Sequence, residues 1–228
     1  MEAEIKPWYK KSWGILLIIF LVFFILLILA LGTFFIKLIV DYNNTEAPII
    51  SDTSYKENTN RILIEGEDNY WTGSQDAQIV IVEFSDFSCP SCKSSFSTIR
   101  ALSSANKELV KHIYRDFPVI GDHSLDLALS ARCAGEQGLF WPMHDKLFTN
   151  QGVKETKEIA LLATQIGADT NRFKECVESG KYLEQIQKDY TDGQELGIVG
   201  TPTWFINGQK ISGDIPPNIF QQIIDQFK

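Results

Sequence analysis

The chain has few of the residues that bind metal ions, with four cysteines, three histidines and two methionines among its 228 residues. His112, His123 and His144 lack the HxxxH-type spacing of a metal site. Basic residues are also a minority, 21 against 29 acidic ones, and the net charge at pH 7 is −8. An acidic chain of this kind has no electrostatic footprint for nucleic acid, so we expect no nucleic-acid partner.

One long stretch, Ser12–Ile36, lacks charge altogether and is mostly apolar. As a helix it would span about 37 Å, more than the ~30 Å hydrocarbon core of a bilayer. A cleaved signal peptide is the alternative, because Ala30 and Gly32 are small enough for a peptidase site. A signal core has only about 7 to 15 apolar residues, whereas these continue to Val40, which favours a retained transmembrane anchor. Both alternatives export the rest of the chain.

Positive charge flanks this segment unequally. Three lysines precede it and only Lys37 follows closely, which by the positive-inside rule puts residues 1–11 in the cytoplasm. The three are Lys6, Lys10 and Lys11. We therefore predict a single-pass protein of the cell membrane whose later part lies outside the cytoplasm. Residues 37–61, rich in small polar and acidic side chains, are expected to be a linker, and 62–228 a folded domain.

The sequence Cys89-Pro90-Ser91-Cys92 follows a buried-strand pattern at Ile79–Phe84 and opens a helical pattern that reaches Ala105. Pro90 suits a first helical turn, so Cys89 lies at or beside the N-cap. Free N–H groups and the helix dipole stabilise a thiolate there and lower the thiol pKa. We predict that Cys89 is the nucleophile and Cys92 the resolving thiol of a redox pair.

Other interpretations of this motif remain open. A structural zinc site would need a second ligand pair, and the remaining cysteines, Cys133 and Cys176, stand alone in the sequence. An inert structural disulfide is a further alternative. A carrier of Cu(I) would use the paired thiolates with a third ligand, and no candidate for that ligand stands out. A chaperone or adhesion module would retain the motif without using it. We expect no metal and no other cofactor.

The remaining patterns predict strands on either side of a block of helices. The strands are 110–117, 203–206 and 209–211, the last two joined by an Asn207-Gly208 turn of type I′. The helices are 124–138, 141–149, 155–166, 171–178, 182–196 and 216–227. This order predicts an α/β fold in which a mixed central sheet is flanked by helices and carries a helical insertion at about 119–196.

Four segments of the domain resemble DsbA-like thiol-disulfide oxidoreductases. They are Glu83–Cys92, Arg115–Pro118, Ala131–Gly138 and Gly200–Thr203. The resemblance covers about 62–228 and implies a thioredoxin fold with an α-helical insertion, here preceded by one transmembrane helix. It also implies that Pro202 has a cis peptide bond, and that Thr201 and Pro202 face the cysteine pair and bind substrate together with Pro90 and Ser91.

Glu83 matches the buried acid that the family has beneath its active site. A carboxylate in an apolar strand is costly without a role or a partner, and we predict proton transfer with Cys92 through water. The alternative is a glutamate on an edge strand that faces solvent. Cys133 and Cys176 match a second disulfide of some family members, and leftover cysteines of exported proteins usually pair. Two buried free thiols are the alternative. The histidines receive no role; His123 and His144 are expected to cap or pack within the helical block.

The resemblance implies an enzyme, a protein thiol-disulfide oxidoreductase, that gives the Cys89–Cys92 disulfide to reduced exported proteins. A DsbB-like membrane partner would reoxidise it. The direction of electron flow stays open, because Pro90-Ser91 lacks the histidine beside the second cysteine that is typical of the strongest oxidants. A reductase, an isomerase or a reductant in cytochrome maturation are the alternatives.

Overall fold

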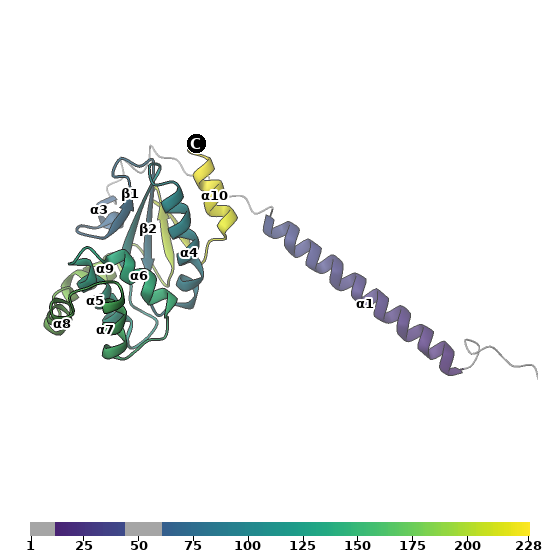
Figure 1. The fold of residues 1–228 in the computed structure, drawn as a ribbon. Helices are drawn as coiled ribbons and strands as arrows, with labels where there is room; N and C mark the ends of the chain where they lie inside the picture. Colours follow the sequence, from purple (N-terminus) through teal and green to yellow (C-terminus); the bar gives the residue numbers. More distant parts are fainter. Residues whose placement is uncertain (1–11, 44–60) are drawn as a thin grey trace, which may run out of the picture. The chain divides into compact units, whose positions relative to one another are not determined.

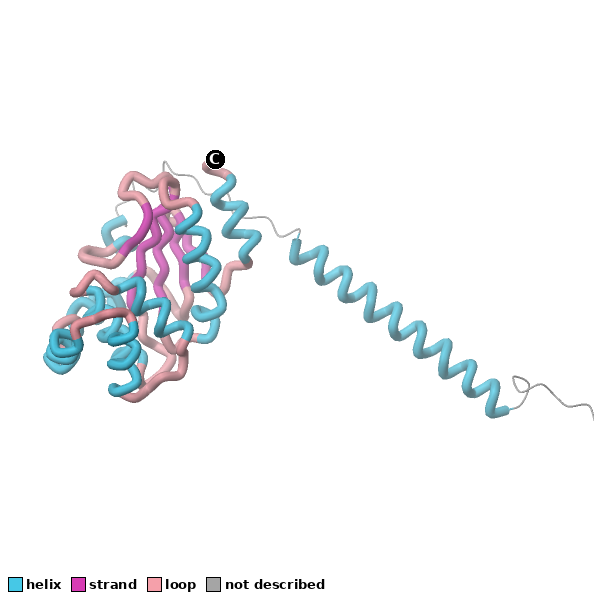
Figure 2. Tube along the Cα trace, in the orientation of Figure 1, coloured by secondary structure: helices cyan, strands magenta, loops and turns pink. Residues whose placement is uncertain are grey.

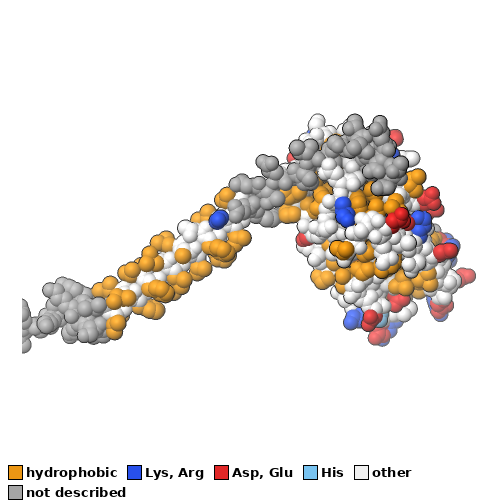
Figure 3. Space-filling view, turned by 180° about the vertical axis from the view of Figure 1, so that it is seen from behind, with side chains coloured by type: hydrophobic (Ala, Val, Ile, Leu, Met, Phe, Trp, Pro, Cys, Tyr) orange, Lys and Arg blue, Asp and Glu red, His pale blue; other side chains and the backbone are white. Residues whose placement is uncertain are grey.

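The computed structural model describes residues 12–43 and 61–228, and the chain divides into two compact units, Met1–Glu46 and Ala47–Lys228. The described part of the first unit is one helix, α1 (Ser12–Asn43), which continues past the predicted end at Ile36. Residues Leu16–Val40 have a mean hydropathy of 3.2 and are long and apolar enough to cross a membrane. Hydrophobic side chains cover the helix in Figure 3. The predictions for residues 1–11 and for most of the linker lie outside the described residues.

The second unit is built on a five-stranded sheet of order β1-β3-β2-β4-β5. The strands are β1 (Trp71–Gly73), β2 (Ile79–Ser85), β3 (Val110–Asp116), β4 (Thr203–Ile206) and β5 (Gln209–Ser212). Only the β2–β3 pair is parallel, and α4 (Pro90–Ala105) is the crossover that such a pair requires. The remaining pairs are antiparallel, so the sheet is mixed as predicted.

Alternation along β2 assigns its side chains to two layers. Ile79 and Ile81 pack in one hydrophobic cluster with residues of α4 and of α10 (Pro217–Asp225). Val80 and Val82 pack on the opposite face in another cluster, with residues of α3 (Arg61–Glu65) and α9 (Leu183–Glu195). Figures 1 and 2 show the sheet between helices on both sides. Glu83 is two positions after Ile81 in the strand, so its side chain lies on the same face of the sheet as Ile79 and Ile81, the face that α4 covers.

The helical insertion consists of α5 (Ser124–Gly135), α6 (Phe140–Thr149), α7 (Thr156–Gln165), α8 (Thr170–Ser179) and α9. Buried charges join it to the end of β3. Arg115 donates to Asp189 at 2.7 Å and to Asp192 at 2.5 Å, both on α9. Arg132 on α5 donates to Asp116 at 2.5 Å and also pairs with Asp189. Each charge of this network thus has a partner of opposite sign, as burial requires.

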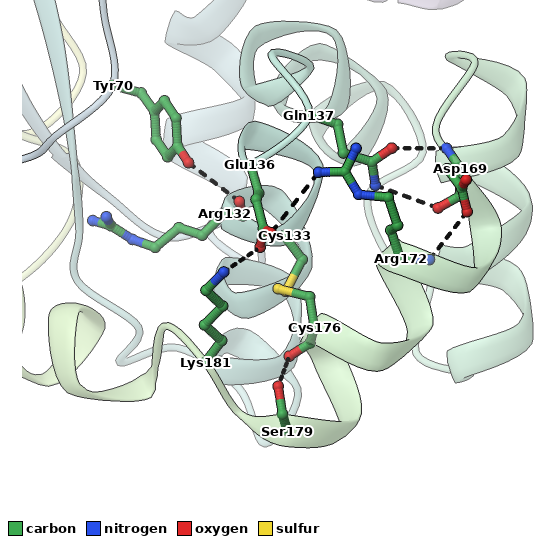
Figure 4. The surroundings of a disulfide bond; sticks show 10 residues. All are labelled: Tyr70, Arg132, Cys133, Glu136, Gln137, Asp169, Arg172, Cys176, Ser179 and Lys181. Carbon is green, nitrogen blue, oxygen red and sulfur yellow. Dashed lines mark hydrogen bonds and ion pairs between the residues drawn. A yellow bond between two sulfur atoms is a disulfide. The ribbon is translucent and has the colours of Figure 1, made fainter.

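A disulfide joins two helices of the insertion, as Figure 4 shows. The Sγ atoms of Cys133 on α5 and Cys176 on α8 are bonded at 2.06 Å. Close by, Lys181 lies 3.0 Å from Glu136, which also pairs with Arg172 at 3.9 Å. The bond therefore adds a covalent link where the surface contacts between these helices are partly exposed ion pairs.

The structure confirms the predicted fold class. Positive φ angles at Asn207 (45°) and Gly208 (80°) fit the type I′ turn between β4 and β5. The sequence patterns missed α3 and β1, because each is shorter than the window in which a period can be recognised. β1 is defined instead by its antiparallel pairing with β3, from Trp71 beside Ile113 to Gly73 beside Lys111.

Candidate active site

The cysteine pair lies at the N-terminus of α4, where Cys89 is the N-cap. Its backbone is extended (φ −79°, ψ 119°), and its Sγ accepts the backbone N–H of Cys92 at 3.3 Å. Pro90 occupies the first turn of the helix, where no N–H is required. Cys92 is 0% exposed and Cys89 3%. Both thiols are thus buried, and of the two Cys89 alone keeps a small exposed surface.

The loop before β4 faces the pair. The peptide bond between Thr201 and Pro202 is cis. The Cys89 thiol donates to the carbonyl oxygen of Thr201 at 3.2 Å, which puts the backbone of this loop directly against the nucleophile. Val199, two residues before Thr201, is 96% exposed and lies on the outer side of the same loop.

The two thiols have very different acidities. The pKa of Cys89 is lowered to about 6, first by the hydrogen bond with the Cys92 thiol and next by the side chain of Thr201 and the backbone N–H groups of Cys92 and Ser91, while burial opposes the shift. Burial raises the pKa of Cys92 far above its usual range, and the hydrogen bond to Cys89 adds to this. At neutral pH the pair therefore holds a thiolate at Cys89 and a thiol at Cys92, as an exchange reaction requires.

Two polar side chains fix the loop that carries Cys89. The Asp86 carboxylate accepts the N–H groups of Ser88 at 2.8 Å, Val119 at 2.7 Å and Ile120 at 2.8 Å, so its role is structural. Gln151, from the loop after α6, donates to the carbonyl oxygens of Phe87 at 3.0 Å and Cys89 at 2.9 Å. Gln151 and Ser88 also line a cavity of about 520 Å³ beside the pair.

Glu83 lies within the sheet and not at an exposed edge. It is 0% exposed, and β2 is flanked by β3 and β4, so the alternative of a solvent-facing glutamate is wrong. Its Oε2 lies 3.1 Å from Nε2 of His112 on β3, and His112 is also 0% exposed. The negative charge of Glu83 raises the pKa of Cys92.

The structure brings Cys89, Cys92 and Thr201 into direct contact, and Pro202 follows Thr201 through a cis bond. Glu83 acts on Cys92 through its charge, and the pair Cys133–Cys176 lies in the insertion. Pro90 and Ser91 are exposed at the start of α4. Sequence reasoning missed His112 and Gln151. His112 carried a signal, a polar residue inside an apolar strand, whereas nothing marks Gln151 because its contacts depend on the path of the α6–α7 loop.

His144 packs among aromatic rings as predicted, within 5.1 Å of Trp141 and 4.9 Å of Phe148, measured between ring centroids. His123 occupies the N-cap position of α5 but makes no side-chain capping bond. In the described ranges 12–43 and 61–228, no three His, Cys, Asp or Glu side chains are grouped so that they could hold a metal ion.

A thiolate and a buried thiol at a helix N-terminus, opposed by a cis-proline loop on a mixed sheet, define the class of thiol-disulfide oxidoreductases. The family model described as thioredoxin matches residues 65–226. The chain belongs to the thioredoxin family.

Solved structures give the same result for the fold. The thiol-disulfide exchange protein alpha-DsbA2 from Wolbachia pipientis is 24% identical, with a TM-score of 0.69 over 78% of this chain and 97% of that one. BdbD from Bacillus subtilis is 25% identical, with a TM-score of 0.63 over 69% and 91% of the two chains. These matches confirm the DsbA-like thioredoxin fold.

Curated relatives share only this domain-sized part. A Na(+)/H(+) antiporter NhaA 1 from Salinispora arenicola is 31% identical over 155 residues, which are 67% of this chain and 24% of the antiporter. The chain thus spans about a quarter of the length of the curated relatives that it matches.

Proposed function

We propose that this protein is a membrane-tethered, extracytoplasmic dithiol oxidase that introduces disulfides into reduced exported proteins. The observation that carries the proposal is the position of Cys89 at the N-cap of α4, where the Cys92 N–H and thiol stabilise a thiolate. Stabilising the reduced form of the pair makes its disulfide a stronger oxidant, because reduction then releases more free energy.

In the proposed reaction a substrate thiolate attacks Sγ of Cys89 in the Cys89–Cys92 disulfide. The S–S bond breaks, its electron pair leaves on Cys92, and Cys92 takes up a proton. A second substrate thiolate then attacks the substrate sulfur of the mixed disulfide and releases the Cys89 thiolate. The substrate has lost two electrons and the enzyme has gained them. Reoxidation requires an acceptor, for which we propose a DsbB-like membrane partner.

The substrate would approach Cys89 beside the Thr201–Pro202 loop, where the peptide flanking its cysteine can pair with free backbone groups. Pro90 and Ser91 form the exposed start of α4 on the same side. The cavity beside Ser88 and Gln151 has room for a neighbouring substrate side chain. Glu83 would exchange the proton of Cys92.

Export is supported by α1, which is apolar over Leu16–Val40. With the lysine-rich N-terminus in the cytoplasm, the domain at Ala47–Lys228 would be outside it. Fusing a reporter that is active on only one side of the membrane to the C-terminus tests this topology. Activity of a cytoplasmic reporter would contradict it.

The reduction potential of Cys89/Cys92, measured by equilibration with glutathione, tests the direction of electron flow. A value well above about −200 mV supports the oxidase, and one near −270 mV would indicate a reductant instead. Oxidation of a reduced model protein should be abolished in Cys89→Ala and retained in the double variant Cys133→Ser/Cys176→Ser, the matched control. Full activity of Cys89→Ala would reject the site, and stoichiometric Cu(I) retention without thiol turnover would favour a metal carrier.

A further inference from the structure

Glu83 and His112 form a pair that is closed to solvent. Both side chains are 0% exposed, and Nε2 of His112 lies 3.1 Å from Oε2 of Glu83. The pair joins the two central strands β2 and β3, on the sheet face that α4 covers. The ring of Trp141 packs against His112 with centroids 5.2 Å apart, which fixes the orientation of the imidazole.

Several buried polar atoms around this pair have no hydrogen-bond partner. Four of them are Glu83 Oε1, His112 Nδ1, Ser85 Oγ and Tyr114 OH, and His144 Nε2 on α6 is another. Native proteins satisfy nearly all buried polar atoms, so a group of unsatisfied ones indicates bound water or a proton-transfer role. These four residues of β2 and β3 all lie on the face of the sheet that α4 covers.

Cys92 is the reactive group in this layer. Cys92 belongs to the same buried cluster as Tyr114, which lies beside Glu83 in the β2–β3 register. The charge of Glu83 raises the pKa of the Cys92 thiol, whereas the Ser85 hydroxyl lowers it. Cys92 is fully buried, and its proton therefore needs an acceptor inside the protein. A carboxylate that is itself buried can act as that acceptor only if a donor holds it in its charged form.

We propose that His112 is a positioning residue for proton exchange at Cys92. With its proton on Nε2, His112 donates to Oε2 of Glu83 and leaves Oε1 free to take or give the proton. This inference rests on the proposed redox role of Cys89 and Cys92, and it assigns His112 a function that the sequence did not indicate.

When a substrate thiolate opens the disulfide, the S–S electron pair leaves on Cys92, and the proton moves to Cys92 from Glu83 Oε1. In the reverse step Cys92 gives its proton to Oε1 and attacks Sγ of Cys89, which expels the bound thiolate. Other titratable or charged groups of the neighbouring elements lie around the pair. They are Tyr114 and Asp116 on β3, His144 and Asp145 on α6, Arg100 on α4, and Asp86 and Cys89 in the loop before α4.

The reverse step can be measured by itself with the aromatic disulfide DTNB. Reduced protein releases one nitrothiobenzoate when Cys89 attacks the reagent, and a second when Cys92 attacks the resulting mixed disulfide. The second release is intramolecular and is followed at 412 nm between pH 5 and pH 9 in the full-length protein.

His112→Phe keeps the ring size but removes the donor. We expect the second release to be about tenfold slower at pH 7, because a hydrogen bond to a charged group contributes roughly that factor. The dependence of the second release on pH should change as well, because the carboxylate that receives the Cys92 proton has lost its hydrogen-bond donor. His112→Gln keeps an N–H donor and should recover most of the rate.

His144→Gln is the matched control, because His144 is equally buried in the same aromatic cluster and lies near the pair, but its hydrogen bond is with Asp145 and not with Glu83. It should change the second release by less than about twofold. A wild-type rate and pH profile in His112→Phe, or equal slowing in His144→Gln, would overturn the proposal. If His112→Phe does not fold, a wild-type rate and pH profile in the smaller His112→Leu, which also lacks a donor, would overturn it equally. Absence of a second release in the wild type would instead refute the redox role of the cysteine pair.

Discussion

Removing the Cys92 thiol should make Cys89 a weaker acid. In the reduced protein the largest cause of the lowered Cys89 pKa is its hydrogen bond with the Cys92 side chain, ahead of Thr201 and the backbone N–H groups. Cys92→Ala removes this donor but keeps the helix N-terminus and the backbone N–H of residue 92. Cys92→Ser replaces the thiol by a hydroxyl that can still donate.

The size of the effect follows from the hydrogen bond. A bond to a charged acceptor contributes about 1.5–3 kcal/mol, and one pKa unit corresponds to about 1.4 kcal/mol. From a starting value of about 6, the pKa of Cys89 in Cys92→Ala should rise by about one to two units. The pKa of Cys89 in Cys92→Ser should stay closer to that of the parent protein.

The assay is the rate of iodoacetamide alkylation of Cys89 against pH, with thiolate absorbance at 240 nm as an independent measure. Cys133 and Cys176 are bonded to each other and do not react. Because folding lowers the pKa of Cys89 from 9.0 to about 6, the thiolate contributes stability to the reduced protein that is complete above about pH 9 and is lost as the pH falls to about 6. In urea unfolding, this contribution should make the free energy of unfolding of the reduced protein larger at pH 8 than at pH 5.

An unchanged titration near pH 6 in Cys92→Ala would refute the reasoning. The helix N-terminus and the Thr201 loop would then account for the whole shift. Equal increases in Cys92→Ala and Cys92→Ser would show that the geometry of the N-cap, and not the donor, is responsible.

Three further changes test the supports of the site. Cys133→Ser/Cys176→Ser opens a loop with a sequence separation of 43, and should lower the free energy of unfolding by up to about 4 kcal/mol while leaving the DTNB reaction intact. Asp189→Asn removes the shared partner of Arg115 and Arg132 and should cost about 3–5 kcal/mol in urea unfolding; a loss below about 1 kcal/mol would show that the network is not what fixes α9. Gln151→Ala removes two donors to the Cys89 loop and should cost about 1–3 kcal/mol, with a higher Cys89 pKa in the alkylation assay; an unaltered pKa would confine Gln151 to a structural role.

The sequence was sufficient for features whose signal is local. The strand at Ile79–Ser85, the helix after Pro90 and the turn at Asn207 each combine a period with a residue suited to the boundary. The resemblance added what has no local signal, including the cis bond at Pro202 and the position of Glu83 beneath the pair.

Contacts between distant segments were not predictable in this way. His112 meets Glu83 because β2 and β3 are parallel in a register that sets Ile81 beside His112. Neither the pairing nor the register can be obtained from two separate apolar patterns. The same holds for Arg115, whose partners on α9 are more than 70 positions away in the sequence.

The contrast between the two thiols also determines what a mixed disulfide does next. Once a substrate is bound to Cys89, either its own second thiol completes the oxidation, or Cys92 attacks and releases the substrate still reduced. The raised pKa of Cys92 slows the second route, because the attacking species is the thiolate. Release of the reduced substrate then depends on how readily Glu83, positioned by His112, accepts the Cys92 proton. Because the proposed pair speeds this proton transfer, slowing it, as in His112→Phe, should favour completed oxidation of the substrate over its release.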